Sequence, residues 1–162
     1  MNVVSDASTL INLARIDKLD LLRQLYGELL IPEAVWGEVV IEGEGQPGAE
    51  KVRTASWIRK SKVENQDIVR VLRQDLDAGE AETIALALEK KADLLLMDER
   101  LGRETAKYLG LQYIGLIGVL ISAKRTGIIG SIKPCLAALR DIAGFRVSDA
   151  LYTRVLRDEG ED

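Results

Sequence analysis

The chain has 162 residues, of which 47% are hydrophobic and 30% are charged, a composition typical of a globular protein. This length corresponds to one domain, so we expect residues 1–162 to form a single domain. Histidine is absent and cysteine occurs once, at Cys135, which excludes Ser-His-Asp triads, histidine-containing metal sites and disulfide bonds within the chain. Carboxylates are the groups that remain in quantity for chemistry.

The net charge is −4, from 22 Lys and Arg residues against 26 Asp and Glu residues. This charge argues against binding nucleic acid by simple electrostatic attraction, although a bound cation can invert the local field. The N-terminus shows no basic segment followed by a long apolar stretch, and no stretch approaches the roughly 20 apolar residues that span a bilayer. We therefore expect a soluble cytoplasmic protein with no membrane association.

The first half of the chain alternates short apolar runs with amphipathic segments. The apolar runs predict strands that end at Asp6 and that lie at residues 29–31, and Trp57-Ile58 with the partly alternating residues after it predict a strand at residues 56–63. The amphipathic segments predict helices at residues 9–14, after Asp17, from Pro32 onward and at residues 66–76. Asp17 is the expected N-cap of the second helix, with Asp20 in its first turn, and Gly27 is the expected stop. Residues 42–48 are expected to form a mobile loop.

The second half contains the strongest helical segment, residues 76–92, in which Ala81, Ile84, Ala85 and Leu88 recur at helical spacing. The apolar run at residues 93–98 is typical of a parallel strand that is covered on both faces. Further elements are expected as a strand at residues 113–118 and helices at residues 102–110, 119–124, 133–142 and 149–157. This alternation predicts an α/β fold, a three-layer α/β/α sandwich with a mostly parallel central sheet.

Acidic residues follow two of the predicted strands, at Asp6 and Asp98. If these strands are neighbours, both carboxylates lie at one edge of the sheet, where the chemistry of such folds is found. Glu38 lies one turn into the helix that Pro32 opens, and Glu80 and Glu82 open the strongest helix. Oxygen ligands without nitrogen or sulfur favour Mg²⁺ or Mn²⁺ over zinc.

Each of these acids also has a purely structural interpretation. Asp6 and Asp98 could cap the helices that follow them, and Glu38 could be a solvated helix residue. Glu80 and Glu82 lie at a helix N-terminus, where the helix dipole favours acids regardless of function. Side chains two residues apart on a helix point about 200° apart, so these two glutamates cannot both face one site.

Four segments carry a resemblance to a known family: VVSDASTLINLARI, LLIPEAVWGEVV, LDAGEAETIALALEKKADLLLMDERLGRETAKYLGL and IGLIGVLISAKRTGII. In their order and spacing they resemble the PIN-domain nucleases, in particular the small bacterial and archaeal members similar to VapC-type toxin ribonucleases. The resemblance covers nearly the whole chain. It implies the PIN-like α/β/α fold and a phosphodiesterase activity that depends on Mg²⁺ or Mn²⁺.

The resemblance also implies roles for individual residues. Asp6, Glu38 and Asp98 match the acids that hold the metal, and Ser8 matches a nearby hydroxyl. Glu80, directly after Gly79, is preferred over Glu82 as the further acid that orients the attacking water. Many toxin members carry another acid soon after the position of Asp98, and here the run Asp98-Glu99-Arg100 departs from that pattern, with Glu99 as the possible replacement. Arg103 is a candidate to hold the substrate backbone.

The implied function is a metal-dependent endoribonuclease. RNA is preferred over DNA only through the resemblance to the toxins of type II toxin–antitoxin pairs, which bind an antitoxin protein and commonly form homodimers. The residues themselves leave open a noncatalytic metal- or protein-binding module and a small-molecule phosphatase.

Overall fold

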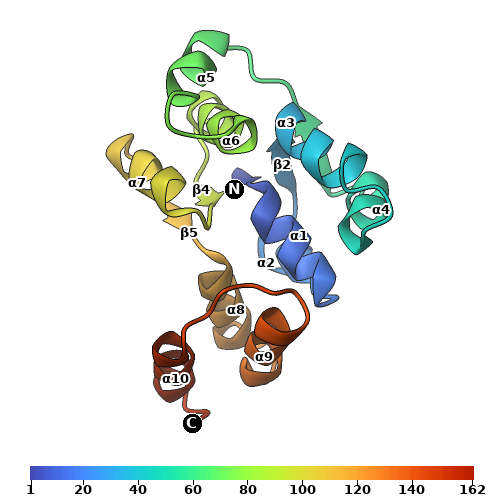
Figure 1. Cartoon of the computed structure of the whole chain (residues 1–162), viewed down its shortest axis with the longest axis vertical. Coiled ribbons are helices and arrows are strands. Elements are labelled where there is room, and N and C mark those ends of the chain that lie inside the picture. The colour runs from blue at the N-terminus through green and yellow to red at the C-terminus, as the bar shows by residue number, and fades with distance from the viewer.

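The computed structural model describes all 162 residues and contains one five-stranded sheet surrounded by helices (Figure 1). The strands are β1 (Val3–Ser5), β2 (Leu29–Pro32), β3 (Ile58–Ser61), β4 (Leu94–Leu96) and β5 (Tyr113–Ile114). They lie in the order β3-β2-β1-β4-β5, and every neighbouring pair is parallel. The predicted α/β sandwich with a mostly parallel sheet is confirmed, and the sheet is parallel throughout.

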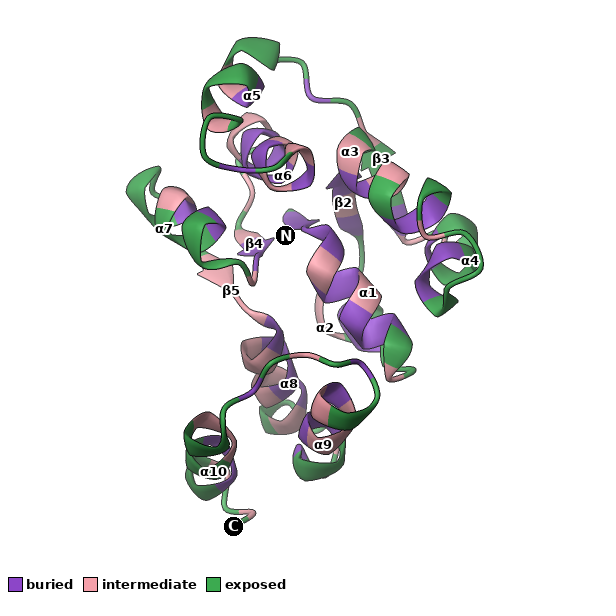
Figure 2. Cartoon of the chain, in the orientation of Figure 1, coloured by how far each residue is buried: buried purple, intermediate pink, exposed green.

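The helices form two layers, each with its own hydrophobic cluster against the sheet (Figure 2). The larger cluster includes buried residues of α1 (Ala7–Arg15), α2 (Asp20–Tyr26), α3 (Glu33–Trp36), the π-helical segment η1 (Gly37–Ile41), α4 (Pro47–Thr54), α8 (Leu116–Arg125), α9 (Lys133–Asp141) and α10 (Asp149–Asp158). The smaller cluster includes residues of α5 (Gln66–Leu72), α6 (Ala78–Glu89) and α7 (Arg100–Tyr108). No helix is both long and apolar enough to cross a membrane.

Adjacent residues of the central strands belong to different hydrophobic clusters. Val3 and Leu96 belong to the larger cluster, whereas Val4 and Leu95 belong to the smaller one. This follows from the alternation of side chains along a strand, which sends neighbours to opposite faces of a sheet. The continuous apolar runs in the sequence are therefore strands with both faces covered.

The strand order positions the functional site. From β1 the chain adds β2 and β3 on one side, then crosses to place β4 on the other side of β1. In an open parallel sheet, a crevice forms outside the carboxyl ends of the strands at such a change of direction. Ser5 pairs with Leu96 in the register of β1 and β4, so the residues that follow both strands meet at this crevice.

The prediction that Asp17 caps the second helix is wrong. Asp17 has a φ of 58° and lies in a tight turn in which Lys18 N donates to Leu13 O. Its carboxylate forms an ion pair with Lys51 at 2.5 Å, so it is not available to the backbone of α2. The helix begins only at Asp20, without a side-chain cap, and ends at Gly27, whose φ of 79° suits a residue without a Cβ.

The sequence does not predict helix α4, whose first two residues fall within the loop expected at residues 42–48. Pro47 occupies the first turn, where its ring favours a helix start, and Gly48 follows it. A Cβ on Gly48 would lie 3.4 Å from the Cβ of Ala14, so this glycine allows α4 to approach α1. Packing against α1, rather than local periodicity, accounts for this helix.

Other boundaries differ by a few residues. The predicted strand at residues 113–118 is too long, because Val119 N donates to Gly115 O and α8 already begins at Leu116. Helix α5 ends at Leu72, four residues before its predicted end, and turns follow it. The predicted strands at the start of the chain and at residues 29–31 and 56–63 are confirmed, with β2 extending to Pro32.

Glu161 connects the last residues of the chain to α8 and α9. Its carboxylate accepts hydrogen bonds from Ile132 N at 2.9 Å, Lys133 N at 3.0 Å and Lys124 Nζ at 2.5 Å, and also from the Ser131 hydroxyl. Burial would raise the pKa of Glu161, but these hydrogen bonds together lower it to about 2. The stabilisation is therefore present above the ordinary pKa of glutamate and is lost as the pH falls through about 2.

Replacing Glu161 by alanine is expected to destabilise the fold. The loss of several charge-assisted hydrogen bonds at the start of α9 should lower the free energy of unfolding by about 2–3 kcal/mol. Urea unfolding at neutral pH measures this difference. Asp162→Ala is the matched control, and equal stability of the Glu161→Ala and Asp162→Ala variants would contradict the prediction.

Candidate functional site

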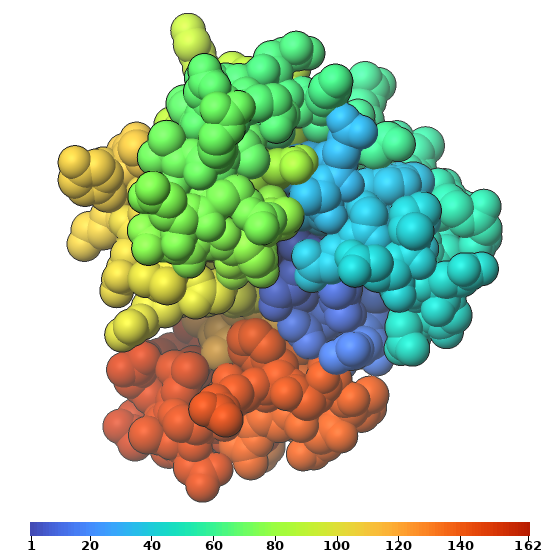
Figure 3. Space-filling model, turned by 45° about the horizontal axis from the view of Figure 1, so that its top comes forward, coloured from blue at the N-terminus to red at the C-terminus, as the bar shows by residue number.

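A cavity of about 340 Å³ opens at the carboxyl edge of the sheet, beside β1 and β4. Figure 3 shows the segments that meet here: the blue N-terminal segment, the cyan segment around η1, the green start of α6 and the orange-red C-terminal segment. The cavity is lined by Asp6, Ala7, Ser8, Glu38, Asp77, Gly79, Glu80, Asp98, Glu99 and Phe145. Six of these ten residues are acidic, and none is basic.

Asp6 caps helix α1 and also lines the cavity. Its Oδ1 atom accepts a hydrogen bond from Thr9 N at 2.9 Å and so caps α1, as one interpretation of the sequence expected. Its Oδ2 atom accepts from Asp98 N at 3.1 Å. The side chain is only 4% exposed. Capping α1 thus holds the carboxylate rigidly between β1 and β4.

Asp98 does not cap the helix that follows it. Its Oδ1 atom accepts a hydrogen bond from Leu116 N at 2.8 Å, and its Oδ2 atom accepts from the Thr9 hydroxyl at 3.4 Å. Glu99 caps α7 instead, through Gly102 N at 2.9 Å. Asp98 is therefore held by α1 and α8, two elements distant in sequence, at the edge that the strand pattern predicted.

Glu38 reaches the cavity from η1 and lies against Gly79 near the start of α6. A Cβ on Gly79 would lie 2.9 Å from Glu38 Oε1, closer than a real Cβ contact allows. Gly115 has a comparable place beside Asp98, because a Cβ there would lie 3.0 Å from Asp98 Oδ1. Two site carboxylates thus pack against glycines.

The start of α6 separates the two glutamates that the sequence left open. Glu80 forms a reciprocal capping box with Asp77, and both residues line the cavity. Glu82 lies on another face of the helix, where its Oε1 atom accepts a hydrogen bond from Ala34 N at 3.1 Å and caps α3. Glu80 is thus placed at the cavity, and Glu82 has a structural contact elsewhere.

The two candidate substrate-binding residues lie in different places. Ser8 lines the acidic cavity, and its hydroxyl accepts a hydrogen bond from Asn12 Nδ2 at 3.2 Å. Arg103 lies outside this cavity, with its guanidinium carbon 5.2 Å from the centre of the Tyr113 ring. It is nevertheless close enough to Asp98 to lower the pKa of that carboxylate in part.

The acids of the cavity have raised pKa values. Burial raises the pKa of Asp6 to about 7, with a further contribution from the Asp98 carboxylate. Burial is also the main cause of the raised pKa of Asp98, against the opposing effects of Leu116 N–H and Arg103. Burial and the nearby Asp77 carboxylate raise the pKa values of Glu38 and Glu80. The protein therefore compensates the negative charge in this cavity only in part.

The donor set suits a hard cation. The six acids offer only oxygen atoms, the ligands that Mg²⁺ and Mn²⁺ prefer, and a cation would relieve their unfavourable ionisation. No three of them are close enough to enclose one ion as they stand. Mg²⁺ commonly uses one or two carboxylates with water and substrate phosphate, a pattern that these side chains can supply.

Four cavity residues were not among the predicted site residues: Ala7, Asp77, Gly79 and Phe145. Asp77 could have been found, since Asp77 and Glu80 have the spacing of a capping box before a helix. Gly79 and Phe145 carry no comparable signal. Phe145 comes from the segment between α9 and α10 and is brought to the cavity by tertiary packing alone.

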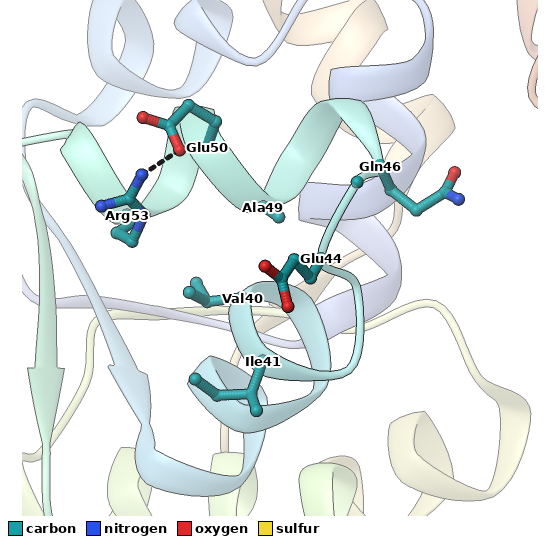
Figure 4. Close-up of a pocket in the computed structure, with 8 residues that line it drawn as sticks. Val40, Ile41, Glu44, Gln46, Ala49, Glu50 and Arg53 are labelled. Carbon is teal, nitrogen blue, oxygen red and sulfur yellow. Dashed lines mark hydrogen bonds and ion pairs between the residues drawn. The ribbon is translucent and has the colours of Figure 1, made fainter.

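Another cavity, of about 490 Å³, lies between η1 and α4 and contains none of the predicted site residues (Figure 4). Val40 and Ile41 border it from η1, and Ala49 borders it from α4. Glu50 and Arg53 form an ion pair with each other on the same helix. The acidic cavity is therefore the better candidate for chemistry.

The similarity of the chain to known proteins agrees with this geometry. A family model described as DUF3368, a PIN domain, matches residues 2–161. No curated protein gives a match to the chain. The family match spans the sheet, the crossover at β1 and β4 and every acid of the cavity. This chain therefore belongs to the PIN-domain family, whose fold is that of nucleases that commonly depend on a divalent metal.

Proposed function

We propose that this chain is a cytoplasmic endoribonuclease that depends on Mg²⁺ or Mn²⁺ and acts as the toxin of a type II toxin–antitoxin pair. The observation that carries the nuclease proposal is the cavity lined by six carboxylates and no basic side chain, at the crevice beside β1 and β4. The choice of RNA and the toxin role rest on the resemblance to VapC-type proteins. By the same resemblance we propose an antitoxin partner and a homodimer.

In the proposed hydrolysis of a phosphodiester, the side chains of the cavity have different roles. Bound Mg²⁺ or Mn²⁺ would neutralise charge on the phosphate and lower the pKa of water. One or two of the carboxylates of Asp6, Glu38 and Asp98 would hold the ion together with water and substrate phosphate, and backbone N–H groups keep Asp6 and Asp98 in place. Glu80 Oε1 accepts a hydrogen bond from Asp77 N in the capping box, and Oε2 would be available to accept a proton from the attacking water. The Ser8 hydroxyl could donate to a phosphate oxygen.

Replacing Asp98 by asparagine is expected to reduce metal-dependent cleavage of single-stranded RNA by about a hundredfold or more. The amide keeps an oxygen for Leu116 N, and it removes the charge and the acceptor of the long hydrogen bond from the Thr9 hydroxyl. Cleavage of a labelled RNA in Mn²⁺ and in EDTA measures the effect. Glu104→Gln is the control, because Glu104 is an exposed acid of α7 that does not line the cavity.

A noncatalytic binding module is the second candidate. It is favoured by the helix-capping contacts of Asp6, Asp77, Glu80 and Glu99, which give these acids a structural role without any ligand. Folded wild type without Mn²⁺-dependent cleavage of RNA or DNA would support this module over the nuclease. Equal cleavage by the wild type and the Asp98→Asn variant would instead indicate a contaminating nuclease.

A further inference from the structure

A basic cavity adjoins the acidic one. It has a volume of about 580 Å³, and Asp98 and Phe145 line both cavities. In Figure 3, the orange-red C-terminal segment faces the yellow segment around α7 across a recess. The two cavities therefore lie next to each other, with Asp98 and Phe145 between them.

Three arginines from different elements line this neighbouring cavity: Arg103 of α7, Arg146 of the segment before α10, and Arg154 of α10. All three are exposed. The ion pairs of the chain use other basic side chains, and none of these three guanidinium groups donates a hydrogen bond within the chain. Asp98 is the only acid that lines the cavity. A concentration of unpaired positive charge is unexpected in a chain of net charge −4.

Aromatic rings lie among these charges. Arg103 lies over the Tyr113 ring, and the half-buried Phe145 borders the entrance from the acidic cavity. Guanidinium groups bind phosphate oxygens, and aromatic rings stack on unpaired bases. Proteins that bind single strands combine these two features along one groove. A base-paired duplex offers its phosphates but keeps its bases stacked inside.

We propose that Arg103, Arg146 and Arg154 bind the nucleotides next to the scissile phosphate of a single-stranded nucleic acid. This inference rests on the proposed nuclease function, because Asp98 connects the arginine cavity to the carboxylates that act on the phosphate. The arginines bind backbone phosphates, and Tyr113 and Phe145 contact the adjacent bases. The acidic cavity then requires a cation to admit phosphate, whereas the arginine cavity attracts phosphate directly.

The test measures binding rather than cleavage. Fluorescence anisotropy with a short labelled single-stranded RNA, in the presence of Ca²⁺, gives the Kd of the wild type and of the Arg146→Ala/Arg154→Ala double variant. The double variant is expected to bind about tenfold more weakly, and each lost phosphate contact should reduce the slope of log K against log salt by about 0.7. Because both arginines are exposed, the thermal stability should not change.

Arg73→Ala is the matched control. Arg73 is exposed, lies directly after α5 at the far end of the molecule from α10, and lines neither cavity (Figure 1). Equal affinity and equal salt dependence of the double variant and this control would overturn the proposal, as would absence of RNA binding by the wild type. If the wild type binds RNA without cleaving it and the double variant binds RNA more weakly, the result would support the subsite and contradict only the nuclease function.

Discussion

Replacing Asp6 by asparagine is expected to stabilise the metal-free protein at about pH 8, although it removes a proposed metal ligand. Asp6 is buried, and its pKa is raised from 3.8 to about 7, so ionising it in the folded state costs about 4 kcal/mol. The asparagine amide would lose the hydrogen bond from Asp98 N, which offsets about 1 kcal/mol of the gain. The free energy of unfolding should therefore rise by about 2–3 kcal/mol.

The free energy of unfolding of the metal-free wild type is expected to decrease with rising pH. Between about pH 4 and pH 7 the folded chain keeps the proton on Asp6 while the unfolded chain releases it. Stability of the wild type therefore decreases as the pH rises through this range, and the raised pKa values of Glu38, Glu80 and Asp98 act in the same direction. Urea unfolding in EDTA over this range measures the slope, which should be smaller in the Asp6→Asn variant.

The control is Asp75→Asn, which removes the charge of an exposed aspartate in the turn after α5. If Asp6→Asn destabilises the protein at all pH values, the cap of α1 outweighs the ionisation cost and the prediction is wrong. Adding Mn²⁺ at about pH 8 should stabilise the wild type more than the variant, since ligand binding favours the folded state.

Replacing Gly79 by alanine is expected to remove most of the activity while preserving the fold. The new Cβ would lie 2.9 Å from Glu38 Oε1, so the carboxylate must move from its place in the cavity. Gly79 lies in the first turn of α6, where alanine is favoured over glycine by up to about 1 kcal/mol. We expect cleavage to fall by about ten- to a hundredfold, comparable to the loss of a residue that orients a metal ligand.

Gly37→Ala provides a matched control beside Glu38 itself. Gly37 is also helical, and a Cβ there would meet no atom within 4 Å. The two variants are compared by RNA cleavage over a Mn²⁺ titration and by thermal unfolding. Equal activity of the Gly79→Ala and Gly37→Ala variants would show that the position of Glu38 does not depend on Gly79.

The sequence was sufficient for the strands β1, β2 and β4, because these are short apolar runs that need both faces covered. It was insufficient where tertiary contacts override local signals. Asp17 has the chemistry of a helix cap but lies in a left-handed turn beside Lys51, and α4 forms because it packs on α1. The predicted range of the two-residue strand β5 is too long, because the strand ends at Ile114 and Gly115 is the N-cap of α8.

The candidate site was predicted best where acids follow strands. The neighbouring positions of Asp6 and Asp98 follow from strand pairing, which the apolar runs allow one to anticipate. Which of Glu80 and Glu82 faces the cavity depends on how α6 is rotated about its axis relative to α3. The sequence shows that only one of the two can face the cavity, but it does not give this rotation. Phe145 could not be predicted, because its place depends on how the segment before α10 folds back across the sheet edge.

The hydrogen bond from Asp98 N to Asp6 joins residues 92 positions apart in the chain. During synthesis the first of these residues leaves the ribosome long before the second, and β1 has no β4 to pair with until then. Contacts between such distant residues form late in folding, after the entropy of closing a long loop has been overcome. A growing chain therefore carries Asp6 and Asp98 apart, and the proposed cleavage of RNA would begin only after β4 has been translated.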